Sequence, residues 1–103
     1  MSLEGINKDD YGYTIELTYK DTDTDSAADV SGYTTGQWLV LKAPSDTETT
    51  VSAGFKTDGS DGVVTYTVTS GDIDAAGTWH VRIKLQSGSS ILRSEWEAFE
   101  VGY

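Results

Sequence analysis

Three aspartates at alternate positions have the spacing that comes closest to a metal site. Asp21, Asp23 and Asp25 stand as the first carboxylates of a calcium-binding loop do. Ser26 occupies the place of the glycine in the sharp turn, and Gly32 occupies that of the bidentate glutamate. The segment is therefore more typical of a solvated acidic loop. Calcium binding by these three aspartates is kept as an alternative.

No set of side chains is spaced for nucleophilic or acid–base catalysis. His80 is the only histidine, and it falls on the polar face of a predicted strand. Carboxylates are plentiful, but nothing in the sequence marks two of them as desolvated, which acid catalysis with a raised pKa would need. The chain has no cysteine, which excludes thiolate chemistry and disulfides. We therefore expect a domain that is not an enzyme and uses no cofactor.

The three tryptophans are the remaining candidates, because flat aromatic rings can stack on sugars or on a protein partner. Trp79 and Trp96 alternate with aliphatic residues and are predicted in the core. Trp38 and Val40 share one face of a strand whose other face is also apolar. If that other face is the inner one, Trp38 and Val40 form an exposed contact surface.

Strands must position these residues, because apolar and polar side chains alternate along most of the chain. Turn residues separate the segments, and Ile73 is the one large apolar side chain available to fill the corner between two of them. The predicted strands cover residues 11–19, 35–43, 50–56, 62–69, 79–85 and the segment that follows residue 89.

Two hairpin turns set the expected register. Asp58-Gly59 and Gly88-Ser89 are both typical two-residue turns, the second of type II′. The expected partners are Ala53 with Val64 across the first turn and Leu85 with Leu92 across the second.

The last strand breaks the alternation. The register of the second hairpin places Trp96 opposite Val81 and Glu97 opposite His80. Beyond these positions the apolar residues change face, so we expect a one-residue bulge near Ala98-Phe99.

These observations predict an all-β protein, an immunoglobulin-like antiparallel β-sandwich of about six or seven strands. The 103 residues suffice for one domain over residues 11–103, with residues 1–10 as a flexible N-terminal segment. The net charge of −10 argues against nucleic acid and against anionic membranes as partners. The N-terminus lacks a signal-peptide core, so we expect no secretion by that route.

The order of short motifs along residues 11–101 resembles the N-terminal domain of the phage baseplate upper protein family, found in tailed phages of Gram-positive bacteria and their prophages. The motifs are Tyr13-Thr-Ile-Glu-Leu-Thr-Tyr19, Ala28-Asp-Val-Ser-Gly32, Lys42-Ala-Pro44, Gly62-Val-Val-Thr-Tyr66 and Ala76-Gly-Thr-Trp79. The chain departs from the family in its turn at Ser45-Asp46-Thr47, which lacks glycine, and in Trp79, where a tyrosine is usual. Family members commonly continue into further domains.

The resemblance implies a structural role in a phage tail or baseplate, assembled in the bacterial cytoplasm and located in the virion. Its implied partners are other phage structural proteins, further copies of the chain, or both, and it implies no catalytic residues. Two alternatives stay open. One is a carbohydrate- or cell-surface-binding sandwich that uses Trp38, and the other is a calcium-stabilised adhesion module that uses Asp21, Asp23 and Asp25.

Overall fold

The computed structural model describes residues 5–21 and 26–103, and within these ranges the secondary structure consists of strands and turns. No helix in the described ranges is long and apolar enough to cross a membrane. The strands are β1 (Thr14–Thr18), β2 (Lys20–Asp21), β3 (Ser26–Ala27), β4 (Gly36–Lys42), β5 (Glu48–Ser52), β6 (Gly54–Phe55), β7 (Val63–Thr67), β8 (Gly77–Ser87), β9 (Ser90–Arg93) and β10 (Glu97–Val101).

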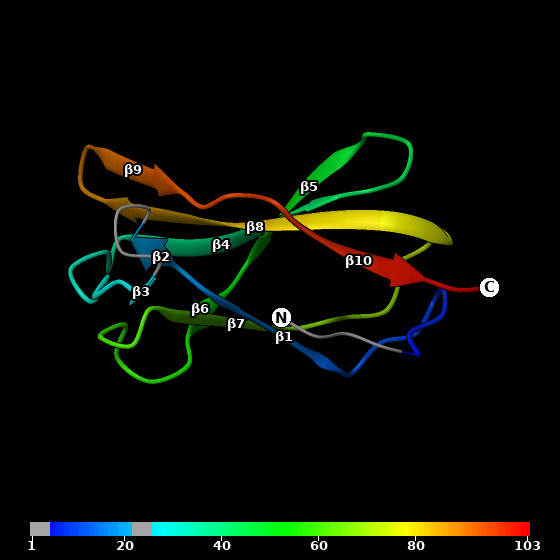
Figure 1. The fold of residues 1–103 in the computed structure, drawn as a ribbon, viewed down its shortest axis with the longest axis horizontal. Helices are drawn as coiled ribbons and strands as arrows, with labels where there is room; N and C mark the ends of the chain where they lie inside the picture. Colours follow the sequence, from blue (N-terminus) through cyan, green and yellow to red (C-terminus); the bar gives the residue numbers. More distant parts are fainter. Residues whose placement is uncertain (1–4, 22–25) are drawn as a thin grey trace.

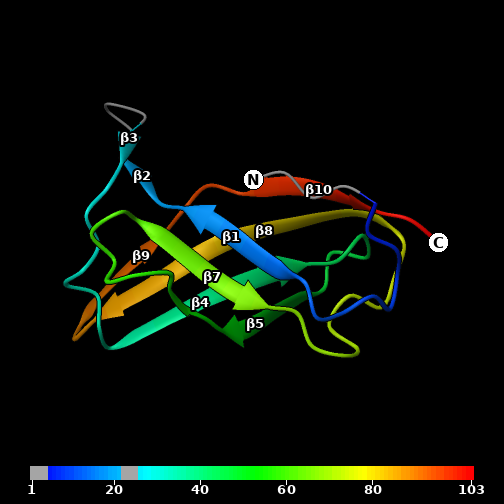
Figure 2. The same cartoon turned by 90° about the horizontal axis from the view of Figure 1, so that it is seen from below.

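Two sheets form facing layers, which confirms the predicted all-β sandwich, and β2 and β3 form a separate two-stranded sheet (Figure 1). One layer has the order β1-β7-β6, and the other has the order β10-β8-β4-β5 with β9 also paired to β8. Every pairing between these strands is antiparallel. Seen from below, β1 and β7 lie across β4 and β8, and the long strand β8 runs through the larger layer (Figure 2).

The core lies between the layers and is filled by the inward residues of both. Ile73 is fully buried, so its predicted role in filling the corner before β8 is confirmed. Trp79 is 3% exposed, stacks on Phe99 with ring centroids 6.5 Å apart, and donates its indole N–H to the Ala75 carbonyl. The predicted core position of Trp79 is confirmed, and its one polar atom has a partner.

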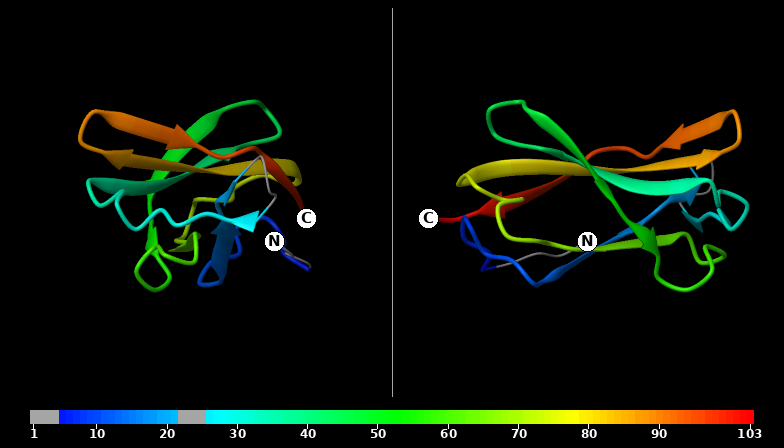
Figure 3. Two further views of the ribbon diagram at one scale, coloured as in Figure 1. Left: turned by 60° about the vertical axis from the view of Figure 1, so that its left-hand side comes forward. Right: turned by 180° about the vertical axis from the view of Figure 1, so that it is seen from behind.

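The segment predicted as one strand over residues 50–56 belongs to both layers. β5 pairs with β4, whereas β6 pairs with β7, and the chain changes layer at Ala53 (Figure 3). Val64 consequently lies opposite Phe55 and not opposite Ala53 as predicted. The connection is longer than a two-residue turn, but a shift of two residues keeps the same faces inward.

The second hairpin has the predicted register. Leu85 lies opposite Leu92, and Gly88 has a positive φ of 57°, as the first position of a type II′ turn requires. Arg93 then lies opposite Lys84, but Glu97 lies opposite Val81. One extra residue is therefore inserted over residues 94–96.

This bulge lies earlier than the predicted one at Ala98-Phe99, and it changes which residues face inward. Phe99 and Val101 are buried, as a bulge was expected to achieve. Ala98 lies opposite His80, so the predicted pairing of His80 with Glu97 is wrong. The expected core position of Trp96 is also wrong, because the bulge turns this residue out of the alternation.

Residues 5–10, part of the segment predicted to be flexible, contact the sandwich. Ile6 belongs to the core, and the N–H of Lys8 donates to the Gly102 carbonyl at 2.7 Å. The start of the described chain is thereby held beside the end of β10. Residues 1–4 lie outside the described ranges.

Candidate interaction surface

The side of the larger sheet that faces away from β1 and β7 gathers aromatic and basic side chains. We call it the outer face. Alternation produces it: because Leu39, Leu41 and Ile83 are fully buried in the core, their strand neighbours point the other way. The outer face comprises Trp38, Val40 and Lys42 of β4, His80, Arg82 and Lys84 of β8, Arg93 of β9, and Trp96 of the bulge. The register also places Glu48 of β5, opposite Lys42, and Glu100 of β10, opposite Thr78, on this side.

Trp96 lies over the basic residues at the centre of this face. The Arg82 guanidinium carbon is 4.3 Å from the centroid of its ring, and the Lys42 ammonium is 5.7 Å from it. Such cation–π contacts are each worth about 0.5–1 kcal/mol at exposed sites. Because Glu95 and Trp96 together face Arg82 across the bulge, the inserted residue is what brings the indole over the guanidinium.

Trp38 lies flat against the same sheet. A Cβ added at Gly36 would sit 2.1 Å from its indole ring, so the ring covers this glycine directly. The Lys84 ammonium lies 5.4 Å from the ring centroid. Trp38 is half-buried and available for contact. Val40, its predicted partner in a contact surface, is only 5% exposed.

The outer face is rich in basic residues for an acidic chain. It holds Lys42, Arg82, Lys84 and Arg93, four of the seven Lys and Arg residues, together with Glu48 and Glu100, whereas the chain has seventeen Asp and Glu. Lys42 pairs with Asp46 at 3.8 Å. Within the described residues, the other three cations form no ion pair with a carboxylate, and the Nε atom of Arg82 is buried without a hydrogen-bond partner.

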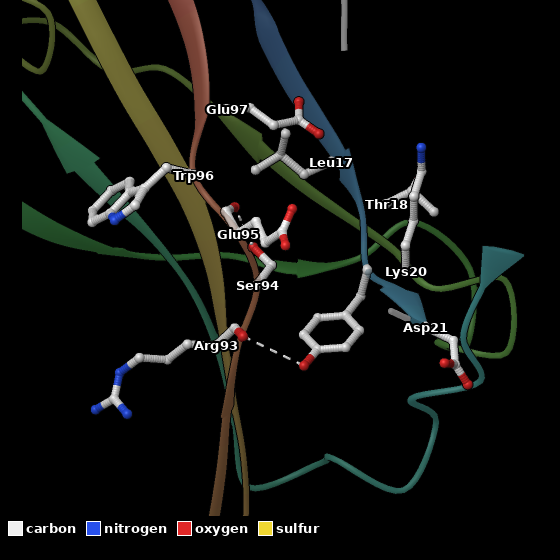
Figure 4. Close-up of a pocket in the computed structure, with 10 residues that line it drawn as sticks. Leu17, Thr18, Lys20, Asp21, Arg93, Ser94, Glu95, Trp96 and Glu97 are labelled. Atoms are coloured by element: carbon white, nitrogen blue, oxygen red, sulfur yellow. Dashed lines mark hydrogen bonds between the residues drawn. The ribbon is translucent and has the colours of Figure 1, made fainter. Parts of the chain in front are cut away.

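A cleft of about 270 Å³ lies beside this face, between the β1–β2 edge and the chain that joins β9 to β10. Figure 4 shows Trp96 and Arg93 directed away from Leu17 and Glu97, which line it. The phenol of Tyr19 donates to the Arg93 carbonyl at 3.4 Å across the cleft. Burial raises the pKa of this phenol. The chain that joins β9 to β10 lies between the cleft and the outer face, and Arg93 and Trp96 border both.

The predicted calcium ligands are only partly described. Asp21 is exposed in β2, opposite Ser26, whereas Asp23 and Asp25 lie outside the described residues. Across residues 5–21 and 26–103, no cluster of three or more acidic or histidine side chains has a metal-binding arrangement. Calcium binding by the three aspartates stays an untested alternative to a solvated acidic loop.

Two loops meet at one end of the sandwich and present fixed carboxylates. Asp29 accepts hydrogen bonds from the N–H and hydroxyl of Ser31, and Asp58 accepts the same pair from Ser60. The Val30 N–H donates to the Gly59 carbonyl at 2.9 Å and joins the loops. These side-chain and backbone hydrogen bonds lower the pKa of both carboxyl groups. We call Asp29, Asp58 and Asp61 the acidic tip.

Sequence reasoning named Trp38 as a candidate, which stays a prediction, but it placed Trp96 in the core and so missed its position on the outer face. The only signal of this position in the sequence is the alternation of apolar and polar residues, which fails near Trp96. A bulge at Ala98-Phe99 and a bulge over residues 94–96 both explain that failure. Comparison with known proteins adds no assignment: no family model matches the chain, and no curated protein is significantly similar to it.

Proposed function

We propose that this domain is a non-catalytic structural module of a phage or prophage tail or baseplate, acting in the virion through protein–protein contacts. The observation that carries the proposal is the outer face, where Arg82 lies over Trp96 and Lys84 lies over Trp38 on one sheet. Tryptophan and arginine are the residues most enriched among those that dominate binding energy at protein interfaces. The resemblance of the motif order to the baseplate family is the reason for proposing a phage tail or baseplate as the assembly in which this surface acts.

The shape and charge of the site support a protein partner. The outer face is the side of an open sheet, whereas sites for small molecules are concave and mostly apolar. The nearby cleft is lined by charged side chains that include Lys20, Asp21 and Glu95. Half-buried aromatic residues surrounded by charged groups are typical of the centre and rim of a protein interface.

The test is the presence of the chain in phage particles. Virions would be purified by density gradient after prophage induction in the bacterium that encodes the chain, and their proteins identified by mass spectrometry. We expect peptides of this chain to co-purify with tail proteins in constant proportion, while an abundant cytoplasmic host protein is lost. A chain that stays in the soluble cell fraction while tails are recovered would contradict the proposal.

A carbohydrate- or cell-surface-binding module is the second candidate, and one observation favours it. The Trp38 ring lies flat over Gly36 and is half-buried, as a ring that stacks on a sugar would be. A glycan array probed with the intact chain tests this function. Binding that disappears in Trp38→Ala but persists in Tyr103→Ala, which removes an aromatic ring that is 97% exposed, would support it.

A further inference from the structure

We infer that the outer face binds the acidic tip of a second copy of this chain, in a contact between two different surfaces. The inference rests on the proposed function, because it names the partner of the same protein-binding surface. It follows from three properties of the described residues, namely the distribution of charge, the cations that lack carboxylate partners, and the rigidity of the tip.

The charges of this chain are separated in space. The four cations of the outer face lie on adjacent strands, since Lys84 is opposite both Trp38 and Arg93, and Lys42 is opposite His80. The remainder of the chain has only three Lys and Arg residues and most of the seventeen acidic residues. Glu48 and Glu100 lie on this face, opposite Lys42 and Thr78, so its basic part is the group Arg82, Lys84 and Arg93. On a molecule of net charge −10, this basic group is complementary to the acidic remainder of its own surface.

The cations of the outer face are available to an external anion. Arg82 and Lys84 contact tryptophan rings, and Arg93 is exposed. None of the three pairs with a carboxylate of the described chain, although acidic residues outnumber basic ones by more than two to one. By contrast, Lys56 on the other sheet pairs with Glu16 at 3.3 Å.

The acidic tip has the properties that such a face requires. Asp29 and Asp58 are exposed, and their own serine hydrogen bonds fix the carboxylates and favour the ionised form. The carboxylate of Asp61 accepts hydrogen bonds from the hydroxyl of Thr57 and the N–H of Val63, which fix it as well. Charges that are already ordered lose little conformational entropy on binding. The tip lies at the end of the sandwich where the loops before β4 and β7 meet (Figure 1).

A contact between face and tip leaves one free face and one free tip in every pair. Contacts of this kind propagate, and they produce rings when the rotation closes and filaments when it does not. Because the attraction is between exposed charges, association should weaken as salt shortens the Debye length from about 30 Å at 0.01 M to about 3 Å at 1 M.

The experiment is sedimentation velocity of the intact chain over a concentration series at about 0.01 M and about 1 M NaCl. We expect oligomers at low salt and an apparent dissociation constant at least about tenfold higher at high salt. The variant Lys84→Glu/Arg93→Glu should be monomeric. Lys8→Glu/Lys56→Glu changes the net charge equally, away from the outer face, and should still associate. Circular dichroism checks that each variant is folded. If Lys84→Glu/Arg93→Glu does not fold, Arg93→Glu alone takes its place.

A mixing experiment identifies which surfaces meet. Asp29→Asn/Asp58→Asn/Asp61→Asn removes the tip charges but keeps oxygen acceptors for the loop hydrogen bonds. Alone it should be monomeric, like the outer-face variant. An equimolar mixture of the two should form a dimer that grows no further, because one intact face and one intact tip remain.

Three results would overturn the inference. One is a wild-type chain that stays monomeric at low salt, another is oligomers that survive in both variants, and the third is a mixture that stays monomeric. A monomer that instead binds poly-L-glutamate or polygalacturonate would assign the face to an external anion and would equally overturn it. Recovery of the chain in virions is measured independently, so a failed inference and a failed proposed function give different patterns of results.

Discussion

The phenol of Tyr66 donates a hydrogen bond to the carboxylate of Asp72 and so ties β7 to the corner that precedes β8. The same carboxylate oxygen accepts the N–H and the hydroxyl of Thr69, each at 2.9 Å. Asp72 is therefore a corner residue, held by hydrogen bonds from Tyr66 and Thr69. Burial acts to raise the pKa of this carboxyl, but the hydrogen bonds from Tyr66 and Thr69 outweigh it, and the pKa is lowered.

The first prediction concerns the pH dependence of stability. A lowered folded-state pKa means that ionised Asp72 stabilises the fold above its ordinary pKa of 3.8, and that this contribution is lost as pH falls through the folded value. Asp72→Asn should therefore lower the free energy of unfolding by about 1 kcal/mol at neutral pH and by less at acid pH. Urea denaturation across pH measures the difference. A deficit that grows on acidification would contradict it.

The second prediction concerns the glycine beneath Trp38. Gly36→Val places a Cβ 2.1 Å from the indole, so the ring must leave the sheet. We expect a change in tryptophan fluorescence and a loss of about 1–3 kcal/mol in the free energy of unfolding. Gly54→Val is the matched control, because no atom lies within 4 Å of a Cβ added at that strand glycine. Equal effects in both variants would show that the ring does not rest on Gly36.

The third prediction compares two tryptophans of opposite environment. Trp79→Ala should cost about 3–5 kcal/mol, because it empties a core position that is 3% exposed and leaves the Ala75 carbonyl without the indole donor. Trp96→Ala removes a half-buried ring and its cation–π contacts and should cost about 1 kcal/mol. Chemical denaturation of both variants provides the comparison. Similar losses would place Trp96 in the core after all.

The fourth prediction concerns calcium. Asp21, Asp23 and Asp25 lack the turn glycine and the bidentate glutamate that complete a calcium loop, so millimolar calcium should leave the melting temperature unchanged. A ligand that binds the folded state alone raises the melting temperature through linkage. A calcium-dependent rise that disappears in Asp23→Asn, with magnesium as the control ion, would establish the site.

Periodic strands were predictable because their pattern is local. The burial of Trp79 and Leu85 along β8 follows from alternation alone, and so does the inward face of β1 with Ile15 and Leu17. The hairpin at Gly88-Ser89 was predictable because turn chemistry fixes its register.

Two features were beyond local patterns for one shared reason. The change of layer at Ala53 and the position of the bulge over residues 94–96 depend on which strand lies alongside. The change of layer leaves the alternation intact, and the position of the bulge alters only the point at which the alternation fails. A shift of two residues in a strand presents the same side chains to the same face. The outer-face position of Trp96, and with it the candidate surface, thus required the three-dimensional pairing.

The change of layer at Ala53 has a consequence for solubility. The carbonyl of Gln37 accepts a hydrogen bond from the N–H of Ala53, so alternate residues of β5 hydrogen-bond to β4. The backbone N–H and C=O groups of Glu48, Thr50 and Ser52 therefore point away from β4. Among the described residues, no strand pairs with that side of β5. Because the chain leaves the sheet there, this bare edge is only five residues long and begins with a charged glutamate. Such an edge is a poor template for amyloid-like growth.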